Sequence, residues 1–516
     1  MRPSRFAAVL LISWISAVAF ASPDHGWART SFAEENLDST PFAQLEQRIK
    51  DEYFRQIRSV IVVKSGRILY EQYFNGATPD TLQDIRSAGK SITSILMGIA
   101  IDNGFVAGVD QRLLSFFPEY DRQTLWDERK DRITLEDALT MRIGLDVPDG
   151  DYSPGSYGNV ETYGETWISD VLDTAVVSEP GTVFEYSSAA SSLCGPVIAR
   201  SSGMSVPEFA ARYLFEPLGI EDYRWTFFPD GSACTAGSFW VRPGDLAKLG
   251  LMMARRGRWE GKQIVSEEWV SRSTAEHLIV NPAIGIGYGY FWWHETYPIG
   301  GRRIPCFFAQ GNGGNRIHVF PTEDLVIVVT SNAYAQPYMF DQVRMMIFRF
   351  ILPASVLSKG SGLGATKLAT VPWTGLGIAG IVFASAVVLW PALALRRRLR
   401  DRRSATAEGP AVLRYPIRTW ATTGALVHLL FVVLIFMTPS FELFLNTGYE
   451  YVIPTEHLLI NWLITVFAVG TALLAVVVWV TRLWSRLARI HYTLVAAAGL
   501  YLLHLLVVWD ALILWA

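Results

Sequence analysis

Residues 85–102, IRSAGKSITSILMGIAID, decide how the rest of the chain is interpreted. Ser87 and Lys90 stand three positions apart at the start of an apolar run with helical spacing. Residues three apart share one face of a helix, so the lysine amine lies close enough to take a proton from the serine hydroxyl. A Ser-x-x-Lys pair alone is weak evidence, and the interpretation depends on the buried helix that follows it. That helix would hold both residues at its first turn, where free backbone N–H groups stabilise an oxyanion.

A third group usually carries the proton to the leaving group at such a site, and it is often a tyrosine. Two Tyr-x-(Ser/Asn) candidates lie downstream of Lys90. Tyr157 lies in a glycine-rich loop with no ordered element after it, whereas Tyr186 leads straight into an apolar helix over residues 189–200. We therefore expect Tyr186 to be the proton relay. The alternative is a turn tyrosine whose hydroxyl only satisfies the backbone.

The segment QGNGGN, residues 310–315, precedes a β-hairpin and lacks bulky side chains. Glycine lets a backbone approach a substrate closely, and a strand-edge N–H there could supply a second oxyanion donor. A glycine-rich turn before a hairpin is an equally good interpretation of this segment taken by itself.

Composition argues against several other functions. The formal net charge of −3 gives no reason to expect a nucleic-acid partner. The eight histidines include no pair at metal-binding spacing, and no Gly-x-Ser-x-Gly turn exists to present a serine to a histidine. We expect no metal and no organic cofactor. The three cysteines, Cys194, Cys234 and Cys306, are expected to be buried thiols. The sequence does not decide whether two of them form a disulfide.

The chain divides into five regions. Residues 1–21 have the pattern of a secretory signal, 22–44 form a lead-in, 45–352 the catalytic domain, 353–373 a linker and 374–516 a membrane region. Whether the signal is cleaved stays open.

Four apolar segments, each near the ~20 residues that span a bilayer, make up the last region: 374–395, 417–437, 457–480 and 491–514. Residues 396–403, which follow the first segment, carry six arginines, and three more lie between the last two segments, whereas the middle connection carries only acidic charges. Arginine-rich loops stay in the cytoplasm. We therefore expect a multi-pass protein of the cytoplasmic membrane, with the lipid bilayer as a partner and the catalytic domain on the periplasmic or extracellular side.

Four motifs occur in an order that resembles the serine β-lactamase and penicillin-binding-protein-like hydrolases, and within them the esterase and 6-aminohexanoate-oligomer-hydrolase branch. The motifs are SAGKS with its apolar helix, ITLEDALTMRIGL over residues 133–145, Tyr-Ser-Ser from residue 186 and Gly-Asn-Gly-Gly from residue 311. The resemblance covers about residues 45–350. It implies an α/β (α+β) fold with an antiparallel sheet flanked by helices, and an active site between the sheet and a helical lobe.

The resemblance also implies roles for individual residues. Ser87 would be the acyl-forming nucleophile, Lys90 its general base and Tyr186 the proton relay. The backbone N–H of Ser87 would be one oxyanion donor and that of Gly314 the other. The remaining oxyanion or substrate-binding residues that it implies are Ser188, Asn312 and Gly313.

Departures from the family's pattern bear on the substrate. The Lys-Thr-Gly of β-lactamases is Gly-Asn-Gly at residues 311–313, so the cation that would bind a β-lactam carboxylate is missing. The Tyr-x-Asn of many members is Tyr-x-Ser. We therefore expect hydrolysis of an ester or amide bond in a small molecule or peptide, and not of a β-lactam. The alternatives are a D-amino-acid peptidase or carboxypeptidase of cell-wall peptides, and a sensor or binding module that acylates slowly or not at all.

Overall fold

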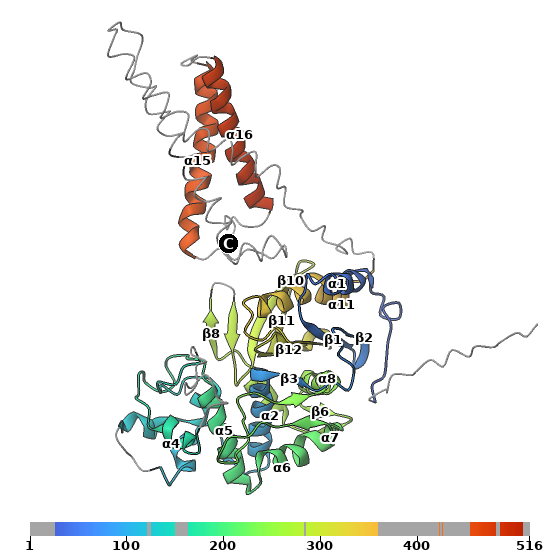
Figure 1. The fold of residues 1–516 in the computed structure, drawn as a ribbon, viewed down its shortest axis with the longest axis vertical. Coiled ribbons are helices and arrows are strands. Elements are labelled where there is room, and N and C mark those ends of the chain that lie inside the picture. The colour runs from blue at the N-terminus through green and yellow to red at the C-terminus, as the bar shows by residue number, and fades with distance from the viewer. Residues whose placement is uncertain are drawn as a thin grey trace, which may run out of the picture.

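The computed structural model describes residues 26–120, 125–149, 164–282, 285–359, 423, 426, 455–480 and 486–508. Its centre is an eight-stranded antiparallel sheet in the order β2-β1-β13-β12-β11-β10-β9-β8 (Figure 1). The strands are β1 (Ile57–Lys64), β2 (Arg67–Tyr73), β8 (Leu278–Asn281), β9 (Ile286–Tyr288), β10 (Trp293–Ile299), β11 (Arg302–Gly311), β12 (Asn315–Phe320) and β13 (Leu325–Ser331).

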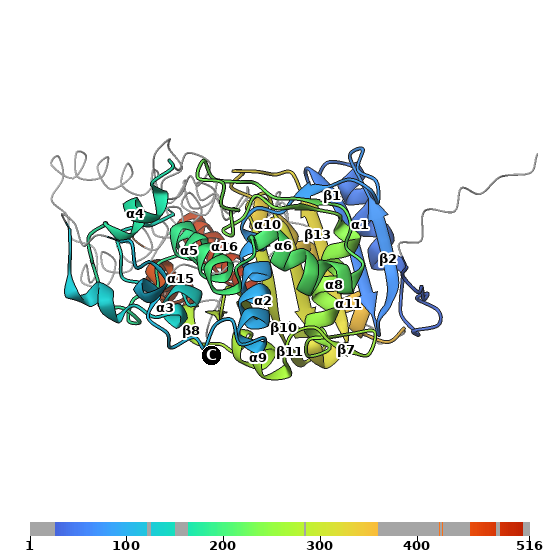
Figure 2. The ribbon, with the colours of Figure 1, turned by 90° about the horizontal axis from the view of Figure 1, so that it is seen from below.

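Each face of the sheet has its own hydrophobic core, because side chains alternate along a strand. Ile61 and Val63 of β1 belong to one core, and Val60 and Val62 belong to the other. The first face is covered by α2 (Gly89–Asp102), α8 (Pro243–Ala254) and α9 (Glu267–Ser273), as Figure 2 shows. The second is covered by α1 (Thr40–Lys50), α10 (Met339–Met345), η7 (Met346–Ile351) and α11 (Leu352–Val356).

A helical lobe packs against α2 on the side away from the sheet (Figure 2). It consists of α3 (Leu135–Leu139), α4 (Trp167–Leu172), α5 (Ser188–Ser202), α6 (Val206–Ala210) and α7 (Glu216–Leu218). There are two smaller sheets among the described residues. One has the strand order β3 (Gln83–Asp84), β5 (Trp240–Val241) and β4 (Tyr223–Arg224), and the other pairs β6 (Arg258–Trp259) with β7 (Lys262–Gln263). The helix that carries Lys90 therefore lies between the sheet and the lobe.

Local sequence signals account for much of this architecture. The turn between β1 and β2 has Ser65 and Gly66 both at positive φ, 51° and 76°, as a tight hairpin of strands with right-handed twist requires. The predicted fold class, with an antiparallel sheet flanked by helices, is confirmed. The three cysteines are free and buried, as expected.

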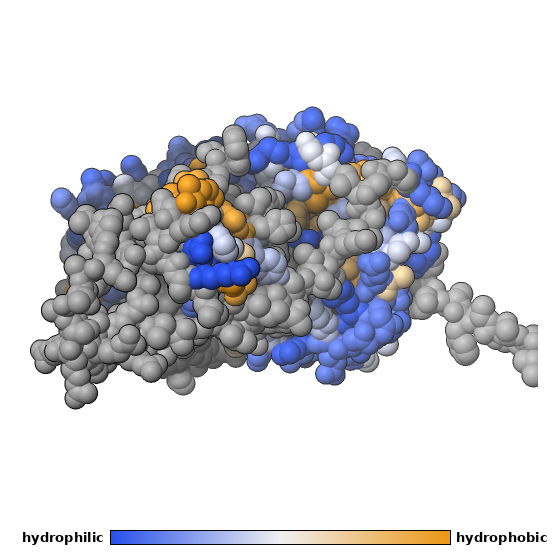
Figure 3. Space-filling view, turned by 90° about the horizontal axis from the view of Figure 1, so that it is seen from above, coloured by the Kyte–Doolittle hydropathy of each residue, from blue (hydrophilic) through white to orange (hydrophobic). Residues whose placement is uncertain are grey.

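Two further helices, α15 (Thr455–Val480) and α16 (Arg486–Val508), pack against each other. They overlap the last two predicted apolar segments. The signal over residues 1–21 and the segments 374–395 and 417–437 lie outside the described residues, Thr423 and Leu426 apart. Within the described part of the chain, no helix is both long and apolar enough to cross a membrane. On the face shown in Figure 3, described side chains are mostly polar, with apolar ones in small patches.

Candidate active site

Ser87 lies in a short 3₁₀ turn, η1 (Arg86–Ala88), that leads directly into α2. Arg86 has a φ of 50°, in the left-handed region that side chains other than glycine seldom adopt. The carboxylate of Asp84 holds this conformation, because it accepts from the backbone N–H and from the Nε of Arg86, each at 3.0 Å. The surroundings thus impose the shape of the turn that carries Ser87.

Two glycines pack directly against this turn. A Cβ on Gly311 would lie 1.9 Å from the carbonyl oxygen of Ile85, and a Cβ on Gly237 would lie 2.8 Å from the carbonyl carbon of Arg86. Neither distance is possible for a real side chain. Glycine therefore allows β11 and the segment before β5 to approach the backbone around Ser87.

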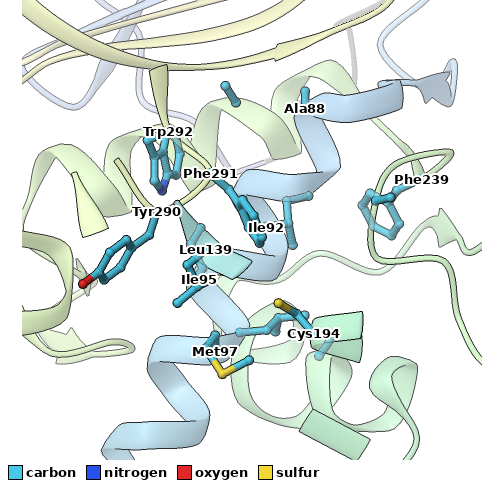
Figure 4. Close-up of a cluster of buried hydrophobic side chains, with 14 of the residues drawn as sticks. Ala88, Ile92, Ile95, Met97, Leu139, Cys194, Phe239, Tyr290, Phe291 and Trp292 are labelled. Atoms are coloured by element: carbon cyan, nitrogen blue, oxygen red, sulfur yellow. The ribbon is translucent and has the colours of Figure 1, made fainter. Parts of the chain in front are cut away.

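Helix α2 is buried on all sides over its first three turns, from Gly89 to Ala100. Figure 4 shows side chains of this helix among those of the elements around it, including Ile92, Ile95, Leu139, Cys194 and Phe291. The predicted burial of this helix is confirmed. Because protein interiors are close-packed, the helix fixes the direction in which Lys90 leaves the backbone.

The Lys90 ammonium is buried and has three acceptors. Its Nζ donates to Ser87 Oγ at 3.0 Å, to Ser188 Oγ at 3.0 Å and to the carbonyl oxygen of Ala236 at 2.7 Å. Three acceptors match the three N–H bonds of a charged lysine. Lys90 therefore links the turn that carries Ser87 to the start of α5 and to Ala236, in the loop before β5.

Tyr186 completes the group around Ser87. Its side chain interacts with that of Ser87, and its ring lies 5.0 Å from Lys90 Nζ. Burial raises the pKa of Tyr186 above its ordinary value, so the phenol keeps its proton at neutral pH. The structure thus brings Ser87, Lys90 and Tyr186 together. Tyr157, the other candidate, lies outside the described residues.

Asp149 is the site residue that sequence reasoning missed. Its carboxylate accepts from the backbone N–H and from the hydroxyl of Ser188, both at 2.6 Å. Burial raises the pKa of Asp149, against the opposing effects of the Lys90 charge and the Ser188 hydrogen bonds. The hydroxyl of Ser188, expected to face a substrate, is instead held between Lys90 and Asp149. The one available signal was the Gly/Pro/Asp-rich composition of residues 146–166, which is typical of functional loops.

The glycine-rich segment contributes differently from the prediction. The N–H of Gly314 donates to the carbonyl oxygen of Gly311 at 3.2 Å, and the N–H of Gly313 donates to the sulfur of Met339 at 3.2 Å. A tight turn thus uses the Gly314 donor that was expected to bind an oxyanion. The role of Gly314 as the second oxyanion donor stays a prediction, with its N–H already engaged in this turn.

Asn312 is tied to the loop after β13. Its side-chain oxygen accepts from the N–H of Ala335 at 2.8 Å, and its carbonyl oxygen accepts from the Asn315 side chain at 2.9 Å. The side-chain oxygen of Asn312 is therefore engaged within the fold. Its backbone N–H directly follows Gly311, the glycine that touches the nucleophile turn.

With this geometry in view, comparison with known proteins identifies the family. The sequence profile of the family described as Beta-lactamase matches residues 42–344, more than half of the chain. The chain belongs to the β-lactamase family. The predicted kinship with β-lactamase-related serine hydrolases is confirmed.

Individual relatives are distant. A 6-aminohexanoate-dimer hydrolase of Paenarthrobacter ureafaciens is 25% identical over 250 residues, which cover 45% of this chain and 60% of that protein. The chain thus spans less than two thirds of the length of this curated relative. The solved structure called "Putative 6-aminohexanoate-dimer hydrolase from Bacillus anthracis" has a TM-score of 0.51 and 19% identity, over 62% of this chain and 85% of that one. A structure from Bacteroides dorei called "putative beta-lactamase" has a TM-score of 0.50 and 19% identity, over 60% of this chain and 98% of that one. The two structures show the fold.

This member of the family has an aromatic wall beside the nucleophile, formed by Phe184, Tyr186, Tyr288 and Trp293. Trp293 stacks on Tyr186 with 5.7 Å between ring centroids, and Tyr288 meets Trp293 edge-on at 4.8 Å. Phe184 meets Tyr288 edge-on at 5.2 Å. Phe184, Tyr186 and Trp293 are partly exposed. The wall is thus a partly exposed apolar surface that includes Tyr186, the tyrosine beside Ser87.

Arg316 does not replace the cation that the glycine-rich segment lacks. Its guanidinium lies over the rings of Phe308 and Phe340, at 5.2 Å and 5.7 Å, and bonds to the side chain of Gln310. Phe308 belongs to the hydrophobic core on the second face of the sheet, the face away from α2. Strand alternation thus turns Arg316 away from Ser87.

Proposed function

We propose that the chain is a serine hydrolase that cleaves an ester or linear amide bond through an acyl-enzyme on Ser87. The observation that carries this proposal is the 3.0 Å contact between Lys90 Nζ and Ser87 Oγ in a buried site. A base within hydrogen-bond reach of the nucleophile is what covalent catalysis by serine requires. Membership in the β-lactamase family supports the same chemistry.

In the proposed reaction, Ser87 Oγ forms a bond to the substrate carbonyl carbon and gives its proton to neutral Lys90. The carbonyl electron pair moves to oxygen and produces a tetrahedral intermediate. The oxyanion electron pair then re-forms the carbonyl, and the bond from carbon to the leaving oxygen or nitrogen breaks, which produces the acyl-enzyme. Tyr186, which holds its proton at neutral pH, donates it to that leaving atom and takes a replacement from Lys90. Water then attacks the acyl-enzyme, and the same groups move protons in the opposite direction.

We place the oxyanion between the backbone N–H groups of Ser87 and Asn312. The N–H of Asn312 follows Gly311, which packs against the nucleophile turn, whereas the Gly314 donor is engaged within its own turn. Two preorganised donors at this position would stabilise charge that develops only in the transition state.

We further propose that the substrate is not a β-lactam and presents an uncharged apolar group to the aromatic wall. The glycine-rich segment supplies no cation for a carboxylate, and Arg316 points to the other face of the sheet. The name of the Paenarthrobacter relative, a 6-aminohexanoate-dimer hydrolase, supports a substrate other than a β-lactam.

Labelling with a fluorophosphonate probe tests the nucleophile. Because Lys90 activates Ser87, the full-length protein should carry one adduct on Ser87 by mass spectrometry. The Ser87→Ala variant should carry none, and Ser169→Ala, which changes an exposed serine of α4, should be labelled like the wild type. A folded wild-type protein that takes up no label would contradict the hydrolase proposal and favour a sensor.

We also propose that residues 374–516 attach the catalytic domain to the outer side of the cytoplasmic membrane. The support is the hydropathy of four sequence segments and the arginines between them. A cysteine introduced within residues 396–403 should resist a membrane-impermeant thiol reagent in intact cells and react after lysis. Labelling of this cysteine in intact cells would reverse the topology.

A further inference from the structure

We propose that Asp149 accepts, through the hydroxyl of Ser188, the proton that Lys90 must lose before Ser87 attacks. This inference rests on the proposed function, because it explains how a buried charged lysine becomes a base. It assigns a role to a residue that no sequence motif singles out.

The three groups form one continuous hydrogen-bonded path. Lys90 Nζ donates to Ser188 Oγ at 3.0 Å, and Ser188 Oγ donates to Asp149 Oδ2 at 2.6 Å. The other oxygen of Asp149 accepts from the backbone N–H of Ser188 at 2.6 Å, which fixes the carboxylate in line with the path. A hydroxyl that accepts from one group and donates to the next is able to pass a proton between them.

Burial favours moving the proton along this path over releasing it to solvent. Lys90 is 1% exposed, Ser188 6% and Asp149 7%. A separated ammonium and carboxylate are costly in such surroundings, whereas a neutral amine and a neutral acid are not. Burial also raises the pKa of the Asp149 carboxyl, which favours the protonated acid.

The other titratable groups near the path are uncharged at neutral pH. Burial raises the pKa of the Tyr186 and Tyr288 hydroxyls and of the Cys234 thiol. The negative charge of Asp149 contributes to the shift of both tyrosines, and the charge of Lys90 opposes that of Cys234. Among these groups, Asp149 is the carboxylate, and both of its oxygens face Ser188.

The transfer balances without any other reactant. One N–H bond of Lys90 breaks and its proton bonds to Ser188 Oγ, while the former hydroxyl proton of Ser188 bonds to Asp149 Oδ2. The products are a neutral amine, an unchanged serine and a neutral carboxylic acid. Lys90 is then free to accept the hydroxyl proton of Ser87 as the acyl bond forms.

The proposal predicts the direction in which the pH–rate profile of Ser87 acylation shifts when Asp149 is replaced. In the wild type, the rate of Ser87 acylation should fall only where solvent protonates Asp149 and removes the acceptor. In Asp149→Asn, Lys90 must release its proton to solvent, and a lysine does so at higher pH than a carboxylic acid. The acid limb of the pH–rate profile should therefore move to higher pH by about one unit or more.

The experiment measures the rate constant of fluorophosphonate labelling of the full-length chain against pH, with folding checked by circular dichroism at each pH. Asp149→Asn and Ser188→Ala should both move the acid limb to higher pH. Ser188→Thr, which keeps the hydroxyl, should restore the wild-type limb. Asp146→Asn is the matched control, because this carboxylate stands on the same loop and is exposed.

Each contrary outcome has its own meaning. A limb that moves to lower pH would show Asp149 acting only as a fixed charge that holds Lys90 protonated. A slower rate with an unmoved limb would show a structural role. Either result overturns the relay, and Ser188→Ala decides if Asp149→Asn does not fold. Wild-type protein without label would instead overturn the hydrolase proposal on which the relay rests.

Discussion

Lys90→Met is expected to lower the rate of Ser87 acylation by about 10²- to 10⁴-fold, the usual contribution of one general base. Methionine keeps the unbranched apolar stem that α2 buries, and it removes the amine that lies 3.0 Å from Ser87 Oγ. The measurement is the rate constant of fluorophosphonate labelling, followed by mass spectrometry of the labelled peptide.

Stability has to be separated from chemistry in this variant. Loss of the ammonium leaves the carbonyl of Ala236 without that donor and the Asp149 carboxyl without a nearby positive charge. Unpaired buried groups of this kind cost about 1–3 kcal/mol each. We therefore expect a lower unfolding temperature in addition to the slower labelling.

Lys130→Met is the matched control. Lys130 is equally buried, at 1% exposure, and donates to the carbonyl of Leu172 at 2.7 Å, in the helical lobe and outside the catalytic group. This variant should also be less stable, but its folded protein should be labelled at the wild-type rate. Wild-type labelling of Lys90→Met would show that another group activates Ser87.

Patterns that depend on near neighbours in the sequence were sufficient to predict which side chains meet around Ser87. Ser87 and Lys90 are joined by one helical turn, so their contact follows from spacing alone. Tyr186 was preferred because a helix follows it, and α5 does begin at Ser188. Strand alternation along β12 likewise accounts for Arg316, which points away from the site.

Contacts between segments far apart in the sequence could not be predicted from sequence patterns. Asp149 meets Ser188 across 39 positions, and no periodicity links the two. The left-handed Arg86 is imposed by Asp84 and the packing around it, whereas arginine has no preference for that conformation. The glycine-rich segment was located correctly, yet which N–H groups remain free depends on the turn that Gly311 and Gly314 close.

The C-terminal region shows what hydropathy of the sequence alone does not decide. Hydropathy predicts four segments that span a bilayer, a criterion that uses composition and length alone. The described helices α15 and α16 overlap two of them, and no described helix meets the requirements for crossing. The membrane region therefore stays a prediction, which the labelling of residues 396–403 tests.

Gly311→Ala is expected to slow Ser87 acylation far more than the added methyl group alone suggests. The new Cβ would lie 1.9 Å from the carbonyl oxygen of Ile85 and 3.0 Å from the backbone nitrogen of Ala88, which bracket Ser87 in the sequence. Both neighbours are backbone, so no flexible side chain can move aside. The nucleophile turn or β11 must shift by about an ångström, and a misplacement of that size costs about 10²-fold in rate.

Gly164→Ala separates this contact from the general effect of replacing glycine. A Cβ on Gly164 would meet no atom of the described residues within 4 Å, so alanine there should leave both labelling rate and unfolding temperature close to wild type. In Gly311→Ala, overpacking should cost about 1–3 kcal/mol of stability as well. If Gly311→Ala is labelled at the wild-type rate while its unfolding temperature falls, the strain is relieved away from Ser87, and the approach of β11 does not set the position of the nucleophile.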